Sequence, residues 1–274
     1  KYISEIVKPS KSYESQKAFT DLLLSNFSNE KIDVIRSLKI EDTWDRGSLS
    51  KILCSDVDAK ILKLIKNKSE NFSDVSDIVD RINYKNIELA KLLLNDKNIK
   101  LGDINDIIRD RFGYTKERYD AKIEFYNSFK NNTSDLECFI QALRHVDEVS
   151  KDFAIKLYSN KDFPKKQIAG IIEVTNKDNL ALAEKLCADK DFPKDNIADI
   201  LSVIHTSNVD YATTLLSNYK KYDIAAQHIS LLIRKYNEIT IEQYKLLEQK
   251  IGKADFATWE ANDIIIGSQL SGLI

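Results

Sequence analysis

The sequence predicts an all-α protein built from antiparallel helix pairs that stack side by side. The chain has 274 residues but only 7 Gly and 3 Pro, too few for the many tight turns of an all-β sandwich or barrel. Apolar residues recur at spacings of three and four, which places them on one face of a helix. The pattern itself returns about every 31 residues, which indicates a repeat architecture.

The first helix of each pair, here called helix A, is marked by an alanine and an apolar residue three positions later. These pairs are Ala59/Leu62, Ala90/Leu93, Ala154/Leu157, Ala183/Leu186 and Ala212/Leu215. Tyr244 and Leu247 take the same two positions near the end of the chain, whereas Ala121 is followed at that spacing by Glu124. Successive anchors lie 31, 31, 33, 29, 29 and 32 residues apart, a period that suits one helical hairpin per repeat.

The second helix, helix B, is marked by an apolar residue followed by two more at +3 and +4, all on one helical face. The sets are Phe19/Leu22/Leu23, Leu49/Ile52/Leu53, Val75/Ile78/Val79, Ile104/Ile107/Ile108, Leu136/Phe139/Ile140, Ile168/Ile171/Ile172, Ile197/Ile200/Leu201 and Ala261/Ile264/Ile265. His228/Leu231/Leu232 keeps the last two members and places a histidine first. Nine sets in register with the A segments are far more than chance predicts.

The residues between helix A and helix B predict a short turn. Asn and Asp follow the A helices at Asn95-Asp96, Asn160, Asp189 and Asn218, and both residue types tolerate the left-handed or turn conformations that end a helix. Pro164 and Pro193 stand just before two of the B sets, where proline suits a first helical turn. Each repeat is therefore expected to be helix, turn, helix.

This pattern, over about residues 14–266, resembles the α-helical solenoids, the class that contains the HEAT, armadillo and tetratricopeptide arrays. The period is shorter than is typical of HEAT and armadillo repeats, and the tetratricopeptide consensus is missing. The resemblance implies a binding scaffold. We expect eight to nine helix pairs in a single superhelical domain over residues 14–274, of unspecified handedness and with a cap at each end, preceded by an extended N-terminal arm over residues 1–13.

Composition and motifs argue against several function classes. With 41 basic and 43 acidic residues the formal charge is −2, which gives no reason to expect nucleic acid. Three cysteines without metal-ligand spacing predict no metal site and reduced, buried thiols. Phosphate-binding glycine loops and the GxSxG motif are missing from the sequence, so we expect no cofactor and no enzymatic activity.

The expected location is the cytoplasm, with a membrane span and a signal peptide both unexpected. The longest apolar runs are far shorter than the roughly 20 residues that cross a bilayer, and the first residues contain no signal-peptide core. The chain begins at Lys1 and contains no Met. We therefore expect a processed fragment whose targeting segment could have been removed.

Two irregular segments interrupt the repeats and are the candidate partner-binding sites. Residues 109–120 interleave basic and aromatic side chains, which can anchor a protein partner or hold and stack a nucleic acid. Residues 41–48 carry a tryptophan that is either an exposed anchor or a lid on the first repeat. The candidate residues are Trp44, Arg46, Arg109, Arg111, Tyr114, Lys116, Arg118 and Tyr119. In each segment the alternative is a loop whose aromatic rings cover the edge of the core.

An acidic column and three histidines are the other polar features. Asp21, Asp77, Asp106, Asp199 and Asp263 stand two residues after the first apolar residue of their B sets. They could bind a basic peptide or a cation, but we interpret them as first-turn residues that the helix dipole favours. His145, His205 and His228 are all expected in B helices, with His228 in a core position.

Three functions are consistent with these observations. The first is a non-enzymatic scaffold that binds a protein or peptide along one face of the solenoid. The second is a nucleic-acid-binding helical-repeat protein that uses the basic-aromatic segment 109–120, and its mark would be positive charge gathered on one surface. The third is an enzyme whose site combines distant repeats around His145 or His205, which would require a buried histidine–carboxylate pair.

Overall fold

The computed structural model describes residues 29–38, 51–53, 55, 57–109, 115–131, 135–236 and 240–252. Within these ranges the regular secondary structure is helical and no β-strand occurs, which confirms the all-α prediction. The expected arm at 1–13, Trp44, Arg46 and the first and last B sets lie outside the described residues.

The chain divides into two compact units, Lys1–Tyr119 and Asp120–Ile274, here called unit 1 and unit 2. The boundary falls within helix α9 (Lys116–Phe129). Each unit is described by itself, and the single domain expected over residues 14–274 stays a prediction.

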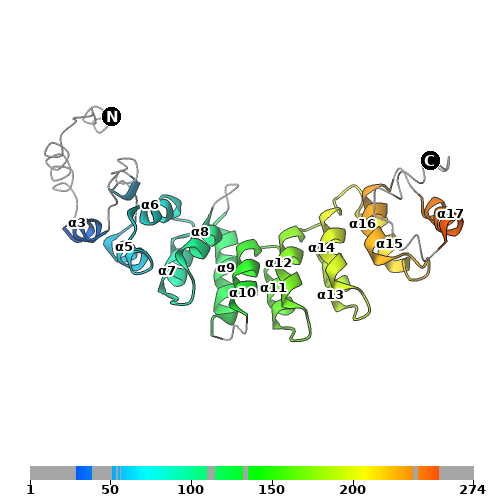
Figure 1. Ribbon diagram of the computed structural model, residues 1–274, viewed down its shortest axis with the longest axis horizontal. Coiled ribbons are helices and arrows are strands. Elements are labelled where there is room, and N and C mark those ends of the chain that lie inside the picture. The colour runs from blue at the N-terminus through cyan, green and yellow to red at the C-terminus, as the bar shows by residue number, and fades with distance from the viewer. Residues whose placement is uncertain are drawn as a thin grey trace, which may run out of the picture. The chain divides into compact units, whose positions relative to one another are not determined.

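Unit 1 contains helices of both expected types (Figure 1). They are α3 (Asn29–Arg36), α5 (Ala59–Lys66), α6 (Phe72–Arg81), α7 (Ile87–Asn95) and α8 (Leu101–Ile108). The A helix α5 packs against α3, α7 and its own partner α6. The B helix α8 likewise packs against its partner α7 and against α6.

Unit 2 continues the alternation after α9 (Figure 1). Its helices are α10 (Leu136–His145), α11 (Lys151–Ser159), α12 (Lys165–Val174), α13 (Leu180–Ala188), the 3-10 turn η1 (Lys194–Asn196), α14 (Ile197–Ser202), α15 (Val209–Asn218), α16 (Ala226–Arg234) and α17 (Ile241–Ile251). The B helix α12 packs against its partner α11 and against the B helices α10 and α14, and α14 contacts α13 and α16 in the same way.

The apolar columns form the core, as the sequence predicts. In every described B set the residues at +3 and +4 are buried, from Val75/Ile78/Val79 to His228/Leu231/Leu232. In unit 2 aromatic rings fill the space between successive pairs: Phe125 stacks on Phe139 with centroids 5.6 Å apart, and Tyr158 meets both rings edge-on. Burial of these apolar faces is what an isolated hairpin could not achieve.

The alanine anchors predicted for the A helices are all buried, but their place along the helix differs between repeats. In α7 the anchor Ala90 is the fourth residue of the helix. In α5 the anchor Ala59 is the first residue, and the fourth residue is Leu62. In α9 Ala121 is buried as predicted, the next residue, Lys122, is fully buried, and Glu124 is exposed. A pattern based on apolarity could not identify a buried lysine as a core residue.

The turns from A to B lie where the sequence predicts them, but the conformation differs. Asp96, Asn160 and Asp189 end their helices in extended rather than left-handed backbone. The side-chain oxygen of each accepts the N–H two residues ahead, at 2.9, 3.0 and 3.0 Å. These local bonds satisfy the turn without a positive φ.

Candidate partner-binding surface

Four of the connections from a B helix to the next A helix are four-residue turns with one shared construction. In these linking turns the side chain of the fourth residue accepts the N–H of the first residue. The turns and their N···O distances are residues 83–86 at 2.8 Å, 147–150 at 3.2 Å, 176–179 at 2.8 Å and 205–208 at 2.9 Å. The fourth residues, Asn86, Ser150, Asn179 and Asn208, are all buried.

The buried asparagines also join consecutive repeats. Asn179 Nδ2 donates to Val174 O at 2.9 Å and to Leu201 O at 3.0 Å, which are the ends of two successive B helices. Asn86 Nδ2 does the same in unit 1, with Arg81 O at 2.8 Å and Ile108 O at 3.2 Å. The last carbonyls of a helix have no intrahelical donor, so one amide satisfies two helix ends at once.

Two buried lysines, one in each unit, also donate hydrogen bonds to backbone carbonyls near the end of a B segment. In unit 2, Lys122 is fully buried and its Nζ donates to Leu143 O at 2.7 Å and to Arg144 O, at the end of α10. In unit 1, Lys31 Nζ donates to Ser55 O at 3.0 Å. Sequence reasoning missed both the asparagine and the lysine contacts, although the spacing N-x-x-N before a helix A marks the asparagine turns 83–86 and 176–179.

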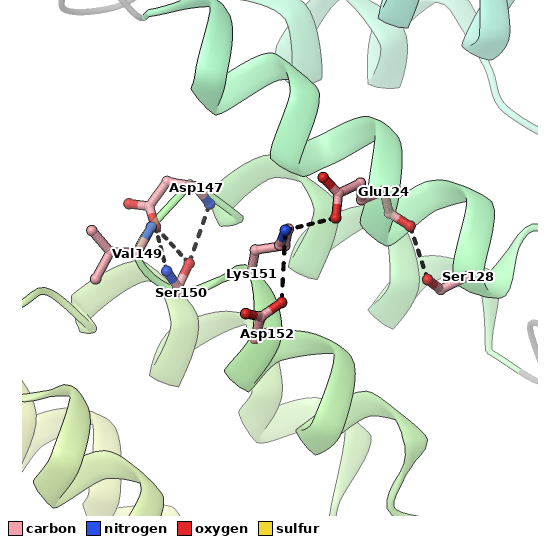
Figure 2. Close-up of polar contacts among 7 residues, drawn as sticks. All are labelled: Glu124, Ser128, Asp147, Val149, Ser150, Lys151 and Asp152. Carbon is pink, nitrogen blue, oxygen red and sulfur yellow. Dashed lines mark hydrogen bonds and ion pairs between the residues drawn. The ribbon is translucent and has the colours of Figure 1, made fainter.

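At least one of the two middle residues of each linking turn is exposed, whereas Lys85 and Asp178 are half-buried. Tyr84 is 78% exposed and Val149 is 37% exposed, and Leu246 of α17 is the other large exposed hydrophobic residue in the described part of the chain. Figure 2 shows Val149 projecting from its turn beside Asp147 and Ser150. Asp147 Oδ1 accepts from the N–H groups of Val149 and Ser150 at 3.1 and 2.8 Å, which holds the exposed residue in place.

An ion pair supports the start of the next helix. Lys151, the first residue of α11, places its Nζ 2.6 Å from Glu124 Oε2 of α9, as Figure 2 shows. This hydrogen bond raises the pKa of Lys151. The pair is exposed, so its contribution to stability is small, but it explains why the A position at Glu124 is polar.

The site residues predicted from the sequence differ in how far they are exposed. Arg109 follows α8 and is exposed, Lys116 begins α9 and is exposed, and Arg118 is half-buried. Tyr119 is fully buried and its hydroxyl donates to Ile108 O at 3.1 Å. Its ring therefore belongs to the core, and the prediction that Tyr119 contacts a partner is wrong. Four further predicted residues, Trp44, Arg46, Arg111 and Tyr114, lie outside the described residues.

Three segments of unit 1 meet at a single carbonyl. Ile108 O accepts from Asn86 Nδ2 at 3.2 Å and from the Tyr119 hydroxyl at 3.1 Å. The linking turn 83–86, the end of α8 and the start of α9 are thereby held together. This contact brings Arg109 close to Tyr84 and Lys85, two residues that sequence reasoning did not single out.

The interpretations of the acidic column and the histidines hold only in part. Asp199 lies in the first turn of α14, as expected. Asp77 and Asp106 are exposed but lie beyond the first turn of their helices, where Asp74 and Asp103 stand instead. His205 lies in a linking turn rather than in a helix. His228 is buried as expected, 2.9 Å from the Tyr244 hydroxyl.

No family model, no curated protein and no solved structure matches this chain. Among the helices of the described ranges, each is too short or too polar to cross a membrane. In the same ranges His, Cys, Asp and Glu do not gather in threes as metal ligands would.

Proposed function

We propose that this chain is a non-enzymatic solenoid of helix pairs that binds a protein or peptide through the exposed edge of its linking turns. The observation that carries the proposal is the contrast within each turn. The fourth residue is buried and its bond to the first is constant, whereas the middle residues are exposed or half-buried and differ from turn to turn. Those middle residues are Tyr84/Lys85, Glu148/Val149, Lys177/Asp178 and Thr206/Ser207.

An ordered turn backbone that carries different side chains at its middle positions is suited to recognition of a partner. The turn backbone is already ordered by side-chain hydrogen bonds, so less conformational entropy is lost when a partner docks. Repeat arrays present such positions along one edge, where each repeat adds a contact to an extended surface. An exposed tyrosine is also the residue type that most often supplies a large share of binding energy.

Protein is favoured over nucleic acid as the partner. Glu148 and Asp178 place carboxylates in two of the linking turns of unit 2, where Lys177 is the one lysine among the middle residues. A phosphate backbone would meet repulsion at each carboxylate. Catalysis is disfavoured by the geometry of the histidines. His145 Nδ1 lies 3.8 Å from Glu173 Oε1, and the Glu173 side chain is 60% exposed, unlike a buried acid–base pair.

The solenoid itself is supported by the pairwise packing inside each unit. In unit 2 the B helices α12, α14 and α16 each contact their own partner helix and a neighbouring B helix. Asn179 bridges the ends of α12 and α14, and Lys122 of α9 bonds the end of α10. Continued through the expected eight to nine pairs, these contacts generate a row of hairpins. A row of hairpins places all linking turns along one edge.

The proposal is tested by quantitative capture of proteins on the immobilised full chain. Tyr84→Ser and Val149→Ser each remove an exposed side chain from a linking turn. We expect the double variant to lower capture of the same protein by about tenfold or more. Leu246→Ser is the matched control, because it removes an exposed apolar residue away from the turns, and it should leave capture unchanged.

Two results would refute the proposal. One is a captured protein whose retention is equal on the double variant and on the unsubstituted chain. The other is no protein capture, together with oligonucleotide binding that weakens steeply as salt rises.

A further inference from the structure

We propose that one corner of unit 1 binds a short acidic segment of a protein partner. The corner consists of Arg81, Tyr84, Lys85 and Arg109, here called the cationic corner. This inference rests on the proposed function and names the chemistry of the partner at one of its turns.

The asparagine bridge assembles the corner from two helix ends and a turn. Asn86 Nδ2 donates to Arg81 O at 2.8 Å and to Ile108 O at 3.2 Å, so the ends of α6 and α8 lie within reach of one amide group. Arg81 ends α6 and Arg109 directly follows Ile108. Tyr84, which is exposed, and Lys85, which is half-buried, are the middle residues of the turn that Asn86 closes. Residues 28 positions apart in the sequence thus become neighbours.

The exposed groups of this corner are suited to carboxylates. Arg109 is exposed and adds its guanidinium to the end of α8. Lys85 Nζ lies 6.0 Å from the centre of the Tyr84 ring, so positive charge stands beside an aromatic face. Arg81 Nη1 donates to Asn105 O at 3.4 Å, which orients this guanidinium toward α8. Guanidinium groups bind carboxylates in a planar, two-bond geometry, and the 78% exposed Tyr84 ring offers an apolar or aromatic side chain a surface.

Charge on the same helices selects a short acidic segment over a long polyanion. The exposed faces of α6 and α8 carry Asp77, Asp80 and Asp106, of which Asp80 pairs with Lys51 at 3.4 Å. A nucleic-acid backbone, with a charge at every nucleotide, would leave the corner and meet these carboxylates. A segment with a few acidic residues needs to reach only the three cations.

The test uses a defined probe with the full chain. The probe is a fluorescein-labelled peptide with two glutamates on each side of one tryptophan, and its binding is measured by fluorescence anisotropy. The comparison ligands are the same peptide with glutamine in place of glutamate and a single-stranded DNA oligonucleotide that carries the same label. We expect the glutamate peptide to bind most tightly and the glutamine peptide to bind about tenfold more weakly or worse.

Substitutions locate the binding. Arg109→Glu should weaken the glutamate peptide about tenfold or more, and Tyr84→Ser should weaken it several-fold. Lys97→Glu changes the net charge equally at an exposed lysine in the turn between α7 and α8, away from the linking turns, and should alter affinity less than twofold. Circular dichroism checks that each variant keeps its helices.

Four results would overturn the inference: no peptide binding, equal binding of the glutamine peptide, tighter binding of the oligonucleotide, or an equal effect of Lys97→Glu. These outcomes are separable from failure of the proposed function. If Tyr84→Ser with Val149→Ser still abolishes protein capture, the turn edge binds a partner of different chemistry. If the peptide binds at the corner but the Tyr84→Ser and Val149→Ser double variant captures as much protein as the unsubstituted chain, the proposed function fails instead.

Discussion

Replacing Asn179 by alanine tests the bridge between consecutive repeats. Its side chain is fully buried and makes three hydrogen bonds: it accepts from Asn176 N at 2.8 Å and donates to Val174 O at 2.9 Å and Leu201 O at 3.0 Å. At about 1 kcal/mol net for each bond, the loss is about 3 kcal/mol. A domain with a total stability of roughly 5 to 15 kcal/mol should show that loss clearly.

The assay is urea-induced unfolding followed by far-ultraviolet circular dichroism. Asn218→Ala is the matched control, since the Asn218 side chain makes one exposed bond, to Thr214 O at 2.8 Å, and its removal should change stability by less than about 0.5 kcal/mol. Asn179→Asp is a second variant. It keeps an acceptor for Asn176 N but turns a buried carboxylate oxygen toward two carbonyls, so it should cost at least as much as alanine.

The reasoning would be refuted if Asn179→Ala and Asn218→Ala shifted the urea midpoint equally. An Asn179→Asp variant that is as stable in urea as the unsubstituted chain would also contradict it. Either result would mean that water or neighbouring groups satisfy the two B-helix ends without the amide.

Three more outcomes follow from buried and capping groups. Lys122→Ala should destabilise unit 2 more than Lys122→Met does, by about 1 to 2 kcal/mol in urea unfolding, because methionine keeps most of the buried methylenes. Burial raises the pKa of Cys187 to about 12, so iodoacetamide at mildly alkaline pH should label it slowly in the folded chain and rapidly in urea, as read by peptide mass spectrometry. The hydrogen bond from Cys138 N lowers the pKa of Asp135, the residue that caps α10. Its stabilising effect is then present above the unfolded pKa of 3.8 and lost as pH falls through the lower folded value, so the difference in urea midpoint between Asp135→Ala and the unsubstituted chain should vanish in acid.

The helices and the core could be predicted because they depend on local periodicity. The sets around Ile168 and Ile197 are buried as the spacing predicts, since three apolar residues on one helical face must leave water. The register of the A helices was harder, because Lys122 is buried through its bonds to backbone carbonyls and no local pattern reports a partner 21 residues away.

The candidate site was predictable only in part. Arg109 was expected at the surface and is exposed, whereas Tyr119, from the same basic-aromatic segment, is buried by its bond to Ile108 O. Composition cannot distinguish an aromatic ring that covers the core from one that faces a partner. Tyr84 was missed because a single tyrosine in a turn has no pattern of its own, and its position depends on the bridge that Asn86 makes.

Small-angle X-ray scattering of the full chain tests the stacked-hairpin proposal most directly. Eight to nine pairs at about 10 Å spacing would extend over roughly 80 to 90 Å and give a radius of gyration of about 25 Å. The same measurement should show a pair-distance distribution with an early maximum and a long tail. A symmetric distribution with a radius near the roughly 19 Å of a compact 274-residue domain would contradict the account.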